Sequence, residues 1–145
     1  MRETAPITVA TREHAGEIAR LLTQLVAPFT ANDILSRWDR WHAEGNSALL
    51  ALRSDGTAAG LATTHVTVVL HRPGPLGRIT SLVVDEPDRR RGIGRALVSA
   101  AETMLAGAGC HMIEITSNVR LQDAHEFYRR VGYEQTSVRF MKKIE

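Results

Sequence analysis

Residues 82–97 read Leu82-Val83-Val84-Asp85-Glu86-Pro87-Asp88-Arg89-Arg90-Arg91-Gly92-Ile93-Gly94-Arg95-Ala96-Leu97. The apolar run at 82–84 is typical of a strand covered on both faces, and apolar residues over 92–106 recur at helical spacing. A strand that leads through a short turn into a helix leaves free amide groups at the helix start, where the helix dipole adds partial positive charge. This order of elements indicates a binding site for an anion such as a phosphate.

Glycines and arginines suit this turn to a pyrophosphate. Gly92 and Gly94 lack the Cβ atoms that would keep a bulky anion from the backbone. Nearby arginines supply charge-assisted hydrogen bonds, and they are Arg89, Arg90, Arg91 and Arg95. A P-loop is excluded because it needs Gly-Lys-Ser or Gly-Lys-Thr, and a dinucleotide fingerprint is excluded because Leu97 stands where that motif has a third small residue.

The rest of the chain predicts a mixed sheet. Strands are expected over 7–11, 47–53, 58–70, 79–85 and 112–116, with a closing strand over 137–144. Helices are expected over 11–26, 32–44, 92–106 and 121–131. The first half reads as an antiparallel meander with two helices, and the second half as a parallel strand-helix-strand unit with a right-handed crossover. The expected fold class is therefore α/β, as one domain over residues 1–145.

Composition narrows the class of protein. The chain has 145 residues, of which 43% are hydrophobic and 23% charged, as in ordinary globular proteins. No apolar run approaches the roughly 20 residues of a membrane span, so we expect a cytoplasmic protein without a membrane partner. The net charge of +2 and seven aromatic residues argue against a nucleic-acid partner. The six histidines and one cysteine have no metal-ligand spacing, so no metal is expected.

The segment Arg89-x-x-Gly92-x-Gly94 resembles the cofactor motif Arg/Gln-x-x-Gly-x-Gly/Ala of the GNAT superfamily of acyl-CoA-dependent N-acetyltransferases. The resemblance covers about 79–133. Its later part comprises Asn118, Ala124 and Phe127-Tyr128-Arg129-Arg130-Val131-Gly132-Tyr133.

The resemblance implies a GNAT-like fold that binds acetyl-CoA. It implies that the strand backbone bonds the pantetheine arm and that the turn and helix start take the pyrophosphate. The cofactor-binding residues so implied are Leu82, Val83, Val84, Arg89, Arg90, Arg91, Gly92, Ile93, Gly94, Arg95 and Asn118. Tyr128 is the implied catalytic residue, a proton donor to the departing CoA thiolate.

The activity implied is direct transfer of an acetyl group from acetyl-CoA to a primary amine of a small molecule or peptide. Many family members have a glutamate early in the corresponding strand, but here the stretch reads Ile79-Thr80-Ser81-Leu82. A water chain, His65 or Glu114 remain as alternatives for the general base. A non-catalytic acyl-CoA sensor or partner-binding module on the same fold is the alternative function. Homodimers are frequent in the family and are left open.

The amine is expected in a groove formed by the first two helices and the loop 71–77. Phe29, Trp38 and Trp41 are expected as apolar walls, because aromatic side chains carry large contact area. Nearby carboxylates that would attract a cation are Asp33, Asp39 and Glu44.

Overall fold

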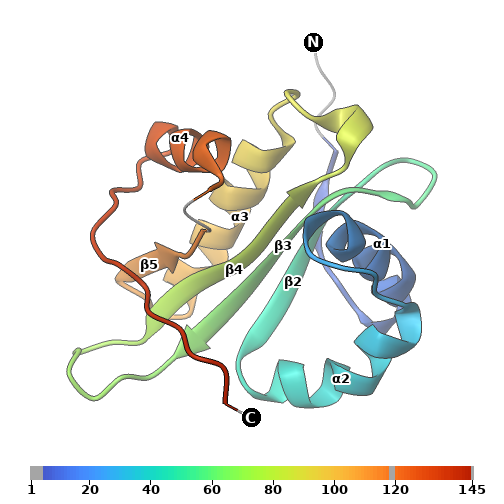
Figure 1. Ribbon diagram of the computed structural model, residues 1–145. Helices are drawn as coiled ribbons and strands as arrows, with labels where there is room; N and C mark the ends of the chain where they lie inside the picture. The colour runs from blue at the N-terminus through green and yellow to red at the C-terminus, as the bar shows by residue number, and fades with distance from the viewer. Residues whose placement is uncertain (1–4, 118–119, 145) are drawn as a thin grey trace.

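A five-stranded sheet with helices on both faces forms the protein (Figure 1). The structure is a computed structural model that describes residues 5–117 and 120–144. The strands are β1 (Ile7–Val9), β2 (Asn46–Leu52), β3 (Ala58–Thr67), β4 (Leu76–Val84) and β5 (Met112–Ile115). The helices are α1 (Ala15–Leu25), α2 (Ala31–Ala43), α3 (Ile93–Gly107) and α4 (Gln122–Arg130), with short 3-10 turns η1 (Arg12–His14) and η2 (Glu86–Asp88).

The connections are those expected from the sequence. The strand order is β1-β2-β3-β4-β5, and β1 to β4 pair with one another in antiparallel fashion. The chain then crosses through α3 to β5, which pairs with β4 in parallel. The α/β class with an antiparallel first half and a parallel strand-helix-strand unit is thus confirmed.

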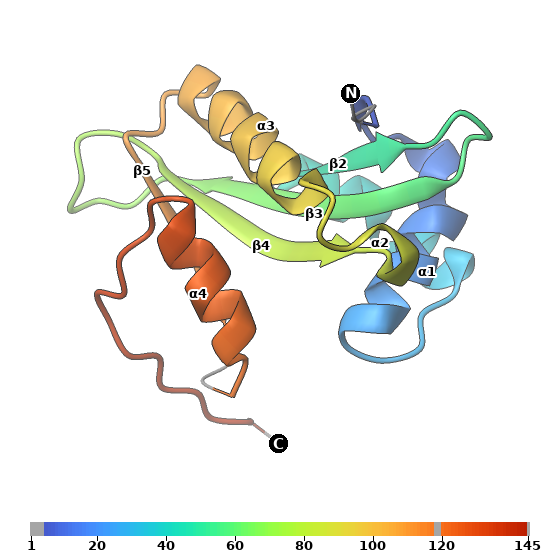
Figure 2. The same ribbon diagram turned by 90° about the horizontal axis from the view of Figure 1, so that it is seen from above.

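Two apolar cores lie on opposite faces of the sheet. One core holds α3 against the sheet through Leu97 and Leu105, and the other holds α1 and α2 through Leu21 and Trp38. Figure 2 shows α3 on one side of the strands, with α1 and α2 away from it. The contact of α3 with β3 is very close, since a Cβ atom on Gly60 would lie 2.8 Å from Leu97 Cδ1.

Local capping explains where α2 begins. Thr30 Oγ1 accepts a hydrogen bond from the Asp33 amide at 3.2 Å, and Asp33 Oδ2 accepts one from the Thr30 amide at 2.8 Å. This reciprocal pair satisfies amides that have no partner within the helix. The helix therefore starts at Ala31, one residue before the expected start.

The predicted closing strand over 137–144 is wrong. Described residues 134–144 form no helix or strand, and the segment stands off the sheet in Figure 2. Its apolar side chains are exposed, with Val138 at 75% and Phe140 at 91%. Alternating residues make a strand only where a neighbouring strand supplies hydrogen bonds, and this segment has no such neighbour among the described residues.

A β-bulge interrupts β4 in its middle. Thr63 on β3 pairs with Ser81, whereas the next residue, Thr64, pairs with Ile79, so Thr80 is an extra residue. An extra residue reverses which face of the sheet the following side chains occupy. Ile79 consequently packs in the α3 core, and Ser81 faces α1 and α2.

Candidate active site

The edge of β4 is open along its second half. β5 pairs only with Leu76–Ile79 of β4 in the described part of the chain. All four residues of β5 take part in this pairing, and β4 continues past the end of β5 (Figure 1). The residues 80–84 therefore lack a neighbouring strand on this side, where an extended ligand arm can bond to the backbone.

The peptide groups along this edge point outward. The Asp85 amide donates to the Ala59 carbonyl of β3 at 2.8 Å, so Asp85 points its amide toward β3. Backbone groups alternate in direction along a strand, which turns those of Leu82 and Val84 to the open side. The Val84 carbonyl accepts a hydrogen bond from Arg89 Nε at 3.0 Å and retains a second lone pair.

The turn before α3 has the backbone shape of an anion site. Arg90 has φ 66° and Gly92 has φ 82°, both in the left-handed region. Alternation of left- and right-handed residues points successive amides into one concavity, and strained residues of this kind cluster where ligands bind. The first bond from α3 back to the turn runs from the Ala96 amide to the Gly92 carbonyl at 3.0 Å, so amides 93–95 precede it.

The two glycines of the motif differ in backbone conformation and in surroundings. Gly92 needs its positive φ, and a Cβ atom there would have no other atom within 4 Å. A Cβ atom on Gly94 would lie 3.4 Å from Phe127 Cζ and 3.5 Å from Val84 Cγ2. Gly94 thus lies next to α4 and the end of β4, and the expectation that it clears space for the pyrophosphate stays a prediction.

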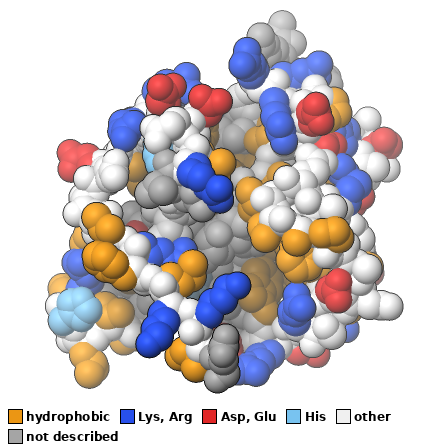
Figure 3. All heavy atoms as spheres, in the orientation of Figure 1, with side chains coloured by type: hydrophobic (Ala, Val, Ile, Leu, Met, Phe, Trp, Pro, Cys, Tyr) orange, Lys and Arg blue, Asp and Glu red, His pale blue; other side chains and the backbone are white. Residues whose placement is uncertain are grey.

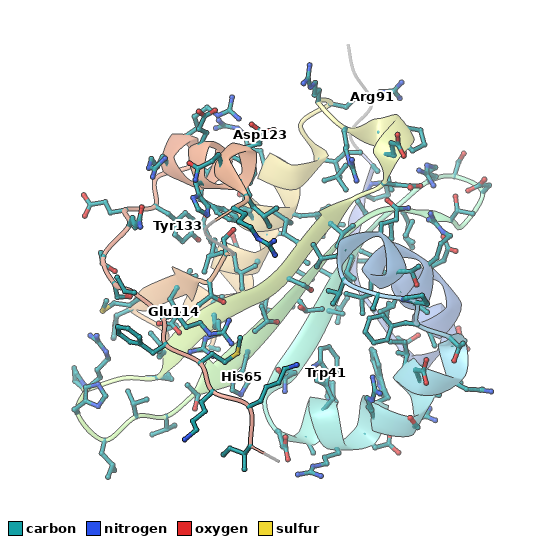
Figure 4. All side chains as sticks on the ribbon, in the orientation of Figure 1. Trp41, His65, Arg91, Glu114, Asp123 and Tyr133 are labelled. Carbon is teal, nitrogen blue, oxygen red and sulfur yellow. The ribbon has the colours of Figure 1, made fainter. Side chains whose placement is uncertain are left out.

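The side chains around the turn divide into buried and exposed groups. Ile93 is buried in the α3 core and Val83 in the opposite core, so only their backbones are available to a ligand. The arginine side chains are exposed; they are Arg89, Arg90, Arg91 and Arg95. Figure 4 shows Arg91 at the upper end of the molecule, beyond the end of β4.

A charged network fixes the base of this turn. Asp85, which is 6% exposed, accepts hydrogen bonds from Arg20 at 3.0 Å, Arg53 at 2.7 Å and Gln24 at 2.8 Å. Arg53 also pairs with Asp88 in η2. The network joins α1, the β2–β3 hairpin and the exit of β4. Burial alone would raise the pKa of Asp85, but the bonds from Gln24, Arg53 and Arg20 outweigh it and lower the pKa well below its usual value.

Tyr128 lies on α4 within a group of aromatic rings. Its ring centroid is 5.6 Å from that of Phe127 and 6.5 Å from that of Tyr133, both edge to face. Burial raises the pKa of Tyr128, so its hydroxyl stays protonated at neutral pH. Tyr133 is engaged otherwise, because its hydroxyl donates to Glu102 at 2.9 Å.

The two side chains expected as alternative bases are occupied by other contacts. His65 Nε2 lies 3.1 Å from the Glu44 carbonyl at the end of α2, and Figure 4 shows it at the lower end of the sheet, opposite Arg91. Glu114 pairs with Arg78 on β4. Asn118, the remaining expected cofactor residue, lies outside the described residues.

A cavity of about 260 Å³ lies on the opposite face of β4, against α1 and α2. Its lining consists of Ile18, Leu22, Phe29, Ile34, Arg37, Trp38, Trp41, Thr63 and Ser81. Phe29, Trp38 and Trp41 lie there, where the sequence placed them. Figure 3 shows hydrophobic side chains gathered over α1, beside a hollow in the surface.

The expected carboxylates and loop are absent from the described lining of this cavity. Asp33 caps α2, Asp39 pairs with Arg12 at 2.7 Å, and Glu44 pairs with Arg40 at 3.0 Å. The loop 71–77 lies at the far end of β4, next to the start of β5. Each carboxylate therefore bonds to another residue of the chain outside the cavity. The spacing of the carboxylates along α2 did not predict these partners.

Sequence reasoning missed three hydroxyl groups at the bulge. Thr63 Oγ1 lies 2.7 Å from Thr80 Oγ1 and also contacts Ser81 Oγ. Thr63 and Ser81 line the cavity, and Thr80 is exposed. The polar sequence Thr80-Ser81 inside an apolar strand was the available signal.

The described residues contain neither a metal-binding cluster nor a membrane-spanning helix. In residues 5–117 and 120–144 no group of three or more His, Cys, Asp or Glu side chains could hold a metal ion. None of the described helices is long and apolar enough to cross a membrane.

Known proteins resemble this chain in sequence and fold. The chain is 39% identical over 95 residues to an aminoalkylphosphonate N-acetyltransferase of Salmonella typhimurium, covering 66% of this chain and 61% of that protein. It is 33% identical over 99 residues to an aminoglycoside N(6')-acetyltransferase type 1 of Stenotrophomonas maltophilia, covering 65% of this chain and 63% of that protein. These matches thus span about three fifths of each relative.

The fold and the family model agree with these relatives. The structure superposes with a TM-score of 0.83 on an aminoglycoside N-acetyltransferase in complex with CoA, at 20% identity, covering 98% of this chain and 97% of the other. The family model described as Acetyltransferase (GNAT) family matches residues 17–133, most of the chain. The chain therefore belongs to the GNAT family of acetyltransferases.

Proposed function

We propose that this protein is an N-acetyltransferase that moves the acetyl group of acetyl-CoA directly to a primary amine of a small molecule. The observation that carries the proposal is the arrangement around β4. An open strand edge leads to an anion-binding turn on one side, and an apolar cavity with hydroxyl groups lies on the other. The aminoalkylphosphonate and aminoglycoside relatives, which are named as N-acetyltransferases, support it.

The residues present fit acetyl-CoA. The outward peptide groups of Leu82 and Val84 match the amides of a pantetheine arm, and the amides at the start of α3 match a pyrophosphate. The exposed Arg90 and Arg95 side chains add positive charge beside the turn. When bound, acetyl-CoA supplies a thioester, which is an activated acyl group.

An amine must lose a proton before it can act as a nucleophile. The lining described for the cavity includes neither a carboxylate nor a histidine. We assign the proton route to the hydroxyl groups of Ser81, Thr63 and Thr80, which run from the cavity to the exposed surface. A hydroxyl relays a proton rather than keeping it, so the final acceptor is solvent water.

We assign the protonation of the leaving CoA sulfur to Tyr128. Its hydroxyl, kept protonated by burial, donates to the sulfur atom that leaves. The protons then balance, because one leaves the amine through the hydroxyl groups to solvent water, one reaches the sulfur from Tyr128, and solvent water returns a proton to Tyr128.

The test is binding and turnover measured side by side. Calorimetry with acetyl-CoA should show binding, and thiol release with a panel of primary amines should show turnover, with the acetylated amine identified by mass spectrometry. Binding without any acetylated product would favour the acyl-CoA sensor. Absence of binding by the folded protein would overturn the assignment of the open edge and the turn.

A further inference from the structure

The cavity carries one charged side chain, and it is positive. Arg37 is the only charged residue in the described lining. Among the described ion pairs none includes Arg37, whereas Arg40 on the same helix pairs with Glu44 at 3.0 Å. The neighbouring Asp33 bonds Thr30, and its lowered pKa is due first to those bonds and least to the charge of Arg37. The Arg37 guanidinium is therefore available to an anionic group of a ligand.

The walls of the cavity suit a small apolar body. Phe29, Trp38 and Trp41 are aromatic, and the Trp38 and Trp41 ring centroids are 5.2 Å apart. The volume of about 260 Å³ lies below the range of roughly 300 to 1,000 Å³ typical of sites for drug-sized ligands. An acceptor of the size of a single amino acid fits this space better than a peptide chain.

The same lining disfavours acceptors with several positive charges. A second ammonium group would face no described carboxylate in the cavity. It would also be repelled by Arg37. Polyamines and aminoglycosides are thus poor matches for this particular chain.

We infer that the acceptor is a primary amine with an apolar, aromatic-sized body and one anionic group, a carboxylate or a phosphonate, that pairs with Arg37. Both anions match the fork of a guanidinium. The inference rests on the proposed function, because it names the substrate class of the same site.

The kinetic test compares matched amines. Phenylalanine, its phosphonate analogue and phenylalaninamide share one body and differ in the anionic group; spermidine represents the polycations. The wild-type protein is compared with Arg37→Gln and with Arg40→Gln as the control on the same helix. For each protein, kcat/KM for the anionic substrate is divided by kcat/KM for phenylalaninamide. The quotient of this ratio in the wild type and in the variant is independent of the different basicity of the amines.

We expect that quotient to be about 10 to 100 for Arg37→Gln, through KM, and close to one for Arg40→Gln. The relative rates of the carboxylate and phosphonate substrates identify which anion the site prefers. A quotient near one for Arg37→Gln, or a preference for spermidine, would overturn the inference.

An equilibrium test separates this inference from the proposed function. The only two tryptophans of the chain, Trp38 and Trp41, both line the cavity, so their fluorescence reports its occupation. With CoA present, 3-phenylpropionate should bind about 10 to 100 times more tightly than 3-phenylpropionamide, and Arg37→Gln should remove the difference. Equal affinities in the wild type would contradict the role of Arg37 even in an active enzyme. The expected difference without acetylation of any amine would retain Arg37 and overturn the transferase activity instead.

Discussion

The two sides of β4 form their sites by different means. On the open edge and at the start of α3, the groups that a ligand could reach are backbone amides and carbonyls, and most nearby side chains are buried or exposed to solvent. On the opposite face, the cavity is formed by side chains from α1, α2, β3 and β4. A backbone site depends on strand pairing and positive φ, whereas a side-chain cavity can change its chemistry by single substitutions.

The largest expected effect is a loss of kcat on the cofactor side of β4. It tests whether Tyr128 donates a proton during the reaction. Tyr128→Phe should lower kcat by about 10² to 10⁴, because general-acid assistance is worth that much, and should change acetyl-CoA affinity little. Steady-state kinetics and calorimetry measure both quantities. Tyr133→Phe is the matched control: it removes the bond to Glu102, so it should cost about 1 kcal/mol of stability and leave kcat within about threefold. Equal kcat in Tyr128→Phe and the wild type, with the chemical step limiting, would contradict the assignment.

The second prediction concerns the network that joins the two sides below the turn. Asp85→Asn leaves Arg20 and Arg53 facing an uncharged partner, and we expect a loss of about 2 to 3 kcal/mol, below the full value for a buried pair because both arginines are partly exposed. Urea denaturation at pH 7 measures this loss.

The pH dependence of that loss has a defined sign. The pKa of Asp85 is lowered in the folded protein, so its contribution is complete above the ordinary carboxyl pKa of about 3.9 and declines as the pH falls further. The stability gap between wild type and Asp85→Asn should therefore narrow below about pH 4. A gap that stays constant from pH 7 to pH 3 would show that the charge of Asp85 does not carry the effect.

The smallest expected effect is the loss of stability and acetyl-CoA affinity on replacing Gly92. We expect this loss to be larger than that on replacing Gly94. Gly92→Ala places a Cβ atom at φ 82°, which should cost about 1 to 2 kcal/mol, divided between stability and acetyl-CoA affinity. Gly94→Ala adds only ordinary contacts with Phe127 and Val84 and should change both quantities little. Thermal unfolding measures the stability of both variants, and calorimetry measures their affinity for acetyl-CoA. Equal losses would mean that Gly94 also clears space for the ligand.

The open edge of β4 and the turn before α3 were easier to predict from the sequence than the cavity on the opposite face. The order of β4, α3 and β5 follows from apolar runs and glycine breaks that are continuous in the sequence, and the structure confirms it. Arg37, Thr63 and Ser81 meet in the cavity from three different elements, which no local pattern connects. The strand expected over 137–144 failed because alternation does not specify a pairing partner. The roles of Tyr128 and Asn118 came from the resemblance and stay predictions.

The bulge at Thr80 makes this point of β4 tolerant of a change in length and sensitive to residue type. Ile79 and Leu82 are three positions apart yet pack on the same face, and Ser81 between them faces the cavity. Deleting Thr80 would place Ile79 directly before Ser81, and because these two side chains already lie on opposite faces, regular alternation would return without turning either half of β4 over. A single-codon deletion at Thr80 would therefore keep the open edge and the cavity on their present faces and remove one of the three hydroxyl groups, whereas a substitution of Ser81 would change the cavity lining itself.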